Sequence, residues 1–143
     1  MKWFCILIFS YFGLNSIIYG QVYINEVCSK NSNNLKDENG EYSDWIELYN
    51  TDNEAIDLHE YYVSDDKSDL YKWNFPNQTI LQSKSFLILY ADSKNNTNIL
   101  FHTNFKLSSN GETLYLSKNQ SLVQTFPFPE IPENQSYGNA SNN

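Results

Sequence analysis

Oxygen-bearing side chains gather around a glycine in the stretch D-E-N-G-E-Y-S-D, residues 37–44. Asp37, Asn39, Glu41 and Asp44 place carboxylate and amide oxygens within this one short segment. Ca²⁺ takes about six to eight oxygen ligands, often from such a loop. The spacing is not that of an EF-hand, so these four residues are candidates for a weak extracellular calcium site. The alternative is a solvated acidic loop in which Asp and Asn side chains form turns.

Patterns that would support catalysis are sparse in this sequence. His59 and His102 are the two histidines, and neither stands in a metal-ligand spacing such as H-E-x-x-H. The chain has no G-x-S-x-G motif and no phosphate-binding loop. A nucleophile pair of Cys28 and His102 would require the fold to bring together residues that are far apart in the chain. The sequence therefore predicts no enzyme, no catalytic residue and no resident cofactor.

Aromatic residues offer a third kind of site, because secreted β-sandwiches can stack exposed rings on sugars. Trp45, Tyr49 and Trp73 are the main candidates for such a platform, together with the neighbouring tyrosines 61, 62 and 71. Exposed apolar patches mark binding surfaces. The alternative is that most of these rings fill the core or brace pairs of strands.

Charge restricts the partners that this chain can bind. The formal net charge is −8, from 17 acidic residues and 9 lysines, and the sequence contains no arginine. Nucleic-acid binders need cations against phosphate and use arginine at base edges. Nucleic acid and anionic lipid are therefore disfavoured, whereas basic proteins, metal ions and uncharged polymers remain open as partners.

The first twenty residues have the pattern of a signal peptide. Lys2 precedes an apolar run from Trp3 to about Leu14, which is short for a membrane helix of about 20 apolar residues. We expect cleavage after Gly20, no membrane insertion afterwards, and a secreted or cell-surface protein; an uncleaved anchor is the alternative. Residues 21–138 then form one domain, and residues 139–143 are expected to be a disordered tail. Cys28 is the single cysteine left, which predicts a small buried side chain on the first strand.

Short apolar runs alternate with clusters of Asn, Ser, Asp and Gly, as in β-sandwiches and barrels. In residues 44–50, Ile46 and Leu48 share one face, which we expect to meet the core. Residues 85–91 are apolar on both faces, which predicts a central strand covered on both sides. Prolines at 127, 129 and 132 predict an extended edge or loop over 127–138. The expected strands are 22–28, 44–50, 55–58, 61–64, 71–75, 79–81, 85–91, 113–117 and 122–126.

An ordered set of segments carries a family resemblance. These are I-N-E-V (24–27), D-W-I-E-L-Y-N (44–50), I-D-L (56–58), Y-Y-V-S-D-D (61–66), K-W-N-F-P (72–76), F-L-I-L-Y-A-D (86–92), H-T-N-F-K-L-S-S-N-G-E-T-L-Y-L (102–116) and S-Y-G (136–138). In this order and spacing the set resembles the bacterial form of the lamin-tail domain over residues 22–138. The resemblance implies an immunoglobulin-like β-sandwich that acts as an interaction module, in a family whose bacterial members often accompany surface proteins or extracellular hydrolases.

The sequence thus predicts an all-β, immunoglobulin-like sandwich that is secreted or surface-associated and contacts a protein or an extracellular polymer. An accessory carbohydrate- or calcium-binding module of an extracellular degrading system is the alternative.

Overall fold

The computed structural model describes residues 22–119 and 121–138, and in these residues the chain is built from eleven strands and their connections. The predicted signal peptide and the predicted tail lie outside the described residues. None of the described residues belongs to a helix that is long and apolar enough to cross a membrane.

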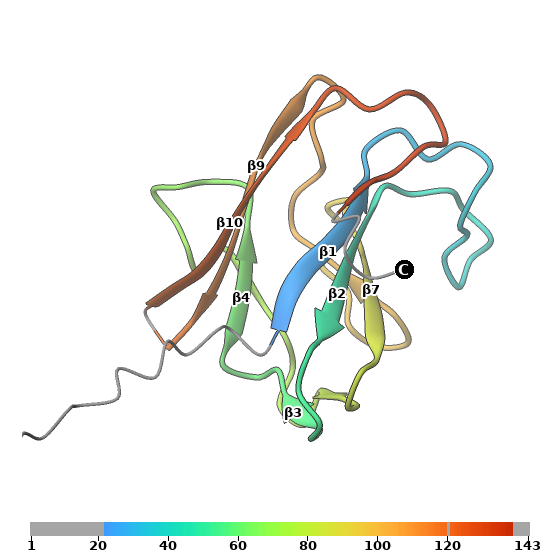
Figure 1. Ribbon diagram of the computed structural model, residues 1–143. Helices are drawn as coiled ribbons and strands as arrows, with labels where there is room; N and C mark the ends of the chain where they lie inside the picture. Colours follow the sequence, from blue (N-terminus) through green and yellow to red (C-terminus); the bar gives the residue numbers. More distant parts are fainter. Residues whose placement is uncertain (1–21, 120, 139–143) are drawn as a thin grey trace, which may run out of the picture.

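Two sheets form the layers of a β-sandwich, which confirms the predicted fold class (Figure 1). The five-stranded sheet has the order β11-β1-β2-β7-β8, and the four-stranded sheet has the order β10-β9-β4-β5. The strands of the first sheet are Tyr137–Gly138 (β11), Val22–Cys28 (β1), Trp45–Asn50 (β2), Phe86–Tyr90 (β7) and Phe101–His102 (β8). Those of the second are Ser121–Pro129 (β10), Gly111–Lys118 (β9), Tyr61–Ser64 (β4) and Trp73–Asn74 (β5). Two short strands, Ile56–Asp57 (β3) and Ile80–Leu81 (β6), pair with each other at one end.

The core lies between the two layers, because each long strand turns alternate apolar side chains inward. Ile46 and Leu48 on β2 are fully buried there, as predicted from their two-residue spacing. Leu114 and Leu116 on β9 meet them from the opposite layer. This interdigitation excludes water from the middle of the sandwich and stabilises the fold by hydrophobic burial.

One sequence prediction about strand placement needs correction. The apolar run at 85–91 forms β7, which lies next to the edge strand β8; the centre of the five-stranded sheet is β2. One end of β7 is open, and Phe86 there is 49 % exposed. The prolines at 127 and 129 lie in β10, an edge strand that pairs with β9 alone, and residues 130–136 form a loop, as the predicted extended edge or loop requires.

A side-chain amide closes the corner where β1 and β10 approach each other across the layers. Gln124 on β10 accepts a hydrogen bond from the backbone N–H of Ile24 at 2.7 Å and donates one to its carbonyl at 3.2 Å. Within the described residues β11 pairs with Glu26 and Val27 of β1, so on that side of β1 the Gln124 amide supplies the partners for the N–H and the carbonyl of Ile24. This contact joins the two sheets at a place where buried polar groups would otherwise lack partners.

Candidate functional site

The loop between β1 and β2, residues 29–44, folds back over the outer face of the five-stranded sheet (Figure 1). Leu35 of this loop packs on a small second core made by Cys28, Trp45 and Tyr90. The phenol of Tyr90 donates a hydrogen bond to the carbonyl of Lys36 at 2.6 Å. Cys28 is fully buried on β1 as predicted, and it carries no disulfide.

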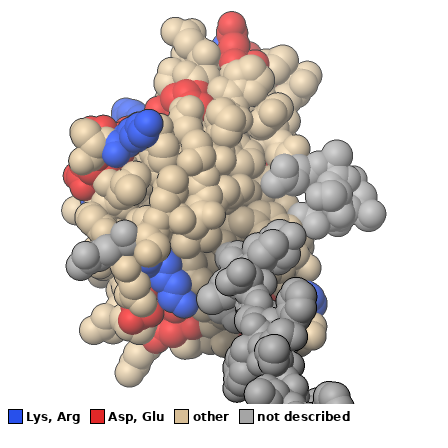
Figure 2. All heavy atoms as spheres, turned by 60° about the vertical axis from the view of Figure 1, so that its left-hand side comes forward, with Lys and Arg blue, Asp and Glu red and all other residues tan. Residues whose placement is uncertain are grey.

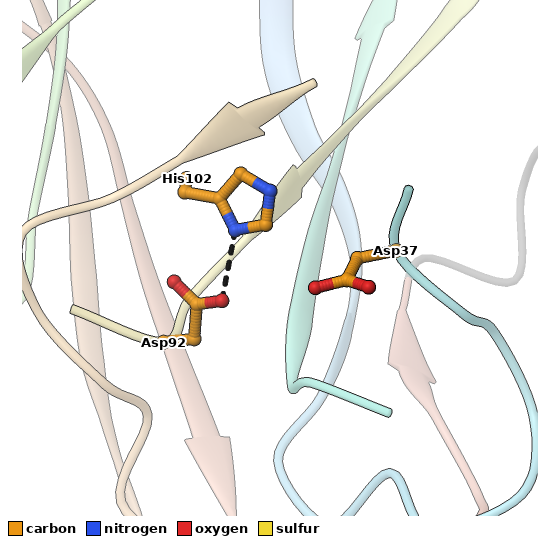
Figure 3. Close-up of side chains that lie close together, drawn as sticks. All are labelled: Asp37, Asp92 and His102. Atoms are coloured by element: carbon orange, nitrogen blue, oxygen red, sulfur yellow. Dashed lines mark hydrogen bonds and ion pairs between the residues drawn. The ribbon is translucent and has the colours of Figure 1, made fainter. Parts of the chain in front are cut away.

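Charged side chains meet where this loop reaches the ends of β7 and β8. The His102 cluster, as we name it, consists of His102, Asp92 and Lys94 from the sheet side and Asp37, Glu38 and Glu41 from the loop. β8 runs parallel to β7 and places Tyr90 beside His102, so the ring of His102 lies close to Asp92, two residues beyond Tyr90 (Figure 3). Figure 3 also shows Asp37 approaching from the loop on the other side.

The imidazole of His102 is fully buried and holds a carboxylate on each ring nitrogen. Nδ1 lies 2.8 Å from Asp92 Oδ2, and Nε2 lies 2.9 Å from Glu38 Oε2. Tyr90 stacks on the ring with centroids 5.3 Å apart. A neutral imidazole has one N–H, and an ionised carboxylate can only accept. Ionised carboxylates at both nitrogens therefore favour the doubly protonated imidazolium.

Lys94 supplies a second cation to the cluster. Its ammonium lies 2.7 Å from Asp37 Oδ2, 2.8 Å from Glu41 Oε2 and 3.0 Å from Asp92 Oδ2. The other oxygen of Asp37 accepts two backbone N–H groups at 2.9 Å, from Asn39 and Glu41. The carboxylate of Asp37 is thus satisfied by one cation and by the turn around Gly40, which has a φ of 79°.

The pKa values follow from this pairing. Burial acts to lower the pKa of His102, but the hydrogen bonds to Glu38 and Asp92 outweigh it and raise that pKa above its usual value. The hydrogen bond from His102 lowers the pKa of Glu38. Burial acts to raise the pKa values of Asp37 and Asp92, yet the bonds from Lys94, from backbone N–H groups and, for Asp92, from His102 bring both below their usual range. The hydrogen bonds to Asp37 and Glu41 raise the pKa of Lys94.

This arrangement fastens the 29–44 loop to the sheet and leaves little room for other chemistry. Ligand atoms of Asp37, Asp92 and His102 lie within 4.8 Å of one another, a distance at which a metal ion can bridge such groups. The ammonium of Lys94 contacts both aspartates, however, so a cation would have to displace it. Both nitrogens of His102 are engaged by carboxylates, so neither can take the proton of the Cys28 thiol.

The four residues predicted to bind calcium do not converge on one point. Asp37 and Glu41 meet at Lys94, whereas Asn39 takes part through its backbone N–H. Asp44 belongs to another environment, where its Oδ1 accepts the N–H of Asn31 at 3.0 Å and burial raises its pKa. The turn at 37–41 directs Asp37 toward Lys94, whereas Asp44 lies immediately before β2; calcium binding by these residues stays a prediction.

Two of the three members of the predicted aromatic platform are buried. Trp73 is 3 % exposed and packs edge-on against Phe75 at 4.8 Å in the main core. Trp45 points to the outer face of its sheet, as its spacing indicates, but it is 7 % exposed because the 29–44 loop covers it. Tyr49 is the half-exposed member, and its ring stacks on Phe86 with centroids 4.4 Å apart.

Sequence reasoning missed the His102 cluster as a unit. One local signal was present: the segment D-S-K at 92–94 follows directly on an apolar strand, so an acid and a base stand at the end of that strand. The neighbouring strand β8, which carries His102, could not be predicted, because it has only two residues and therefore shows no alternation.

A different feature appears on the outside of the four-stranded sheet. The side chains there, which we call the uncharged face, are Tyr62 of β4, Thr113 and Tyr115 of β9, Leu122, Thr125 and Pro127 of β10, and Tyr71 from the β4–β5 loop. Tyr71 and Tyr62 form an edge-to-face pair with centroids 4.9 Å apart. Figure 2, which brings the left-hand side of Figure 1 forward, shows an uncharged area in the middle of the view with charged atoms nearer its rim.

Comparison with known families agrees with this architecture. Residues 17–129 match the family model described as Lamin Tail Domain. No curated protein and no solved structure matches the chain.

Proposed function

We propose that this chain, which belongs to the lamin tail domain family, acts outside the cell as an interaction module and contacts a protein or an extracellular polymer through its uncharged face. The family is one of immunoglobulin-like, non-catalytic domains, and the all-β sandwich of this chain agrees with that class. The finer parts of the proposal are the location, the partner and the surface that the partner meets.

The uncharged face is the observation that carries the proposal. The centres of protein interfaces are depleted in charged residues and enriched in tyrosine relative to the rest of the surface. This chain has a formal net charge of −8, yet the outward positions of β4, β9 and β10 within the described residues hold Tyr, Thr, Ser, Leu, Pro and Gly. Leu122 and Tyr71 are exposed there, at 50 % and 43 %.

The charged residues on the five-stranded sheet have a structural role. The two cations and four carboxylates of the His102 cluster contact one another and hold the 29–44 loop in place. A catalytic acid or base needs a proton position that a substrate can reach. The two ring nitrogens of His102 face Asp92 and Glu38 instead of a substrate. The proposal therefore assigns binding to the uncharged face and stability to the His102 cluster.

Location outside the cell rests on the predicted signal peptide at residues 1–20. An export signal would place the sandwich where protein and polymer partners of the cell surface are found. The described part of the chain carries one cysteine and no disulfide, so the fold is stabilised by its core and its polar contacts.

Expression of the full tagged chain in its own host, followed by fractionation, tests the proposal. We expect the protein in the medium and on the cell surface, shortened at its N-terminus. Thr125→Lys places a charge on the uncharged face and should abolish retention at the surface. Thr97→Lys changes an exposed threonine in the loop before β8 and should leave retention intact. Protein that stays inside the cell, or equal retention of the two variants, contradicts the proposal.

A further inference from the structure

We propose that the uncharged face binds a neutral polysaccharide, with the Tyr62–Tyr71 pair as the ring-stacking site. The inference rests on the proposed function, because it assigns a ligand class to the same face. It differs from the platform that the sequence indicated, since the two tryptophans of that platform are buried.

The geometry of the two tyrosines leaves an aromatic surface open. Their ring planes are at 88°, so one ring points its edge at the other and keeps both of its own faces clear of its partner. Tyr71 is 43 % exposed, and Tyr62 is partly exposed on β4. An exposed aromatic ring presents an apolar face that can pack on the C–H face of a pyranose.

The loop that carries Tyr71 is fastened to the sheet before any ligand binds. The hydroxyl of Ser117, a fully buried residue of β9, donates to the carbonyl of Leu70 at 2.9 Å. The N–H of Tyr71 donates to Asp69 Oδ1 at 3.2 Å. A ring that is already positioned loses less conformational entropy on binding, which favours affinity for a ligand with few strong contacts.

Hydroxyl groups also lie on this face, across β9 and β10. The partly exposed Tyr115 of β9 pairs with the exposed Thr125 of β10. Thr113 lies two residues from Tyr115 on the same face. Neutral hydroxyls both donate and accept, which is the hydrogen-bonding character of a sugar hydroxyl.

Charge narrows the classes of ligand that can bind this face. A polyanion would be repelled by a chain with a formal net charge of −8, and a basic protein would gain more from the acidic surface than from an uncharged one. A neutral polysaccharide loses no ion pairing on an uncharged sheet face. Its hydroxyls and ring faces match the two kinds of group that this face offers.

The inference is tested by measuring how much of the protein insoluble polysaccharides remove from solution. The purified protein is mixed with acid-swollen cellulose, with chitin, with an insoluble β-1,3-glucan, and with cross-linked polygalacturonate as the anionic control. We expect retention on at least one neutral polymer and none on polygalacturonate. Tyr71→Ala should weaken retention about tenfold, equal to about 1.4 kcal/mol. Tyr42→Ala, which removes a ring of 41 % exposure from the 29–44 loop, should not change it.

The outcomes separate this inference from the proposed function. Failure of every neutral polymer to retain the protein, or undiminished retention of Tyr71→Ala, overturns the polysaccharide assignment. If Thr125→Lys nevertheless abolishes retention on cells, the face still serves as an interface and its partner is a protein. A dimer in light scattering that Tyr71→Ala dissociates would assign the face to a second copy of this chain and overturn the inference. Unchanged circular dichroism of both variants shows that the fold is intact.

Discussion

Replacing His102 by glutamine removes the buried cation that joins β8 to the 29–44 loop. The ring is fully buried, and the carboxylates on its two nitrogens lie at 2.8 and 2.9 Å. Removing one partner of a buried ion pair costs about 3–5 kcal/mol, because the remaining charge stays desolvated. Asp92 keeps Lys94 as a partner, so we expect a loss near the lower end, about 3 kcal/mol at pH 6. That loss corresponds to a decrease in Tm of roughly 12 °C for a domain of this size.

The same pair makes stability depend on pH in a direction that the structure fixes. The pKa of His102 is raised in the folded state above an unfolded value of about 6.5. Its contribution is therefore complete below about pH 6.5 and is lost as the pH rises through the folded pKa, with a slope of up to about 1.4 kcal/mol per pH unit. The pKa values of Glu38 and Asp92 are lowered, so their contribution is present above about pH 4.5 and is lost as the pH falls through the folded values.

Urea unfolding at pH 6 and at pH 9 measures both effects. We expect the difference in unfolding free energy between wild type and His102→Gln to be largest at pH 6 and to shrink at pH 9. His59→Gln serves as the control, because its side chain is 45 % exposed and sits in weak contact with Asp57. A difference that stays the same at both pH values would show that the folded ring does not hold a second proton, and the imidazolium assignment would be refuted.

Four further substitutions and one ligand test address the remaining contacts. Lys94→Met leaves the buried carboxylate of Asp37 without its cation, and we expect a loss of about 3 kcal/mol in urea unfolding together with faster hydrogen exchange in residues 29–44. Millimolar Ca²⁺ followed by a chelator should leave the Tm of the wild type unchanged, because the Lys94 ammonium already occupies the position between the carboxylates of Asp37, Glu41 and Asp92; a rise that the chelator reverses would establish the calcium site that the sequence suggests. Gln124→Ala removes the amide from both backbone groups of Ile24 and should lower the unfolding free energy by about 1–3 kcal/mol. Gly111→Ala should lower it by roughly 3 kcal/mol, since φ is 87° and the new Cβ would lie 2.6 Å from backbone atoms of β10; Gly40→Ala has a similar φ but open space around it and should cost less, and equal losses would contradict this explanation.

Local patterns were sufficient to predict the layers of the fold. The local patterns identified the strands of both sheets except the two-residue strands β8 and β11. Alternation placed Ile46 and Leu48 on the core side, because side chains of a strand point to opposite faces in turn. The same alternation put Trp45 on the outer face correctly. Its burial was beyond prediction, since it depends on a loop of sixteen residues folding back over the sheet, and that path is set by the contacts of Leu35 and the His102 cluster.

The site residues were harder to predict, because they come from segments far apart in the chain. Asp37 and Lys94 are 57 residues apart, and Glu38 and His102 are 64 apart. The acidic stretch was recognised by its composition, but no local signal showed that its carboxylates form ion pairs with Lys94 and His102. The uncharged face was hidden for the same reason. Its residues come from four segments whose register is visible only in the paired sheet.

Chemical labelling of tyrosines on the protein bound to its cell surface, compared with the free protein, identifies the face that the partner covers. Our account predicts that Tyr62, Tyr71 and Tyr115 become protected on binding, whereas Tyr42 and Tyr137, which lie on the five-stranded sheet side, are labelled as in the free protein. Protection of Tyr42 or Tyr137 with unchanged labelling of Tyr71 would show that the partner binds elsewhere, and would contradict the assignment of binding to the uncharged face.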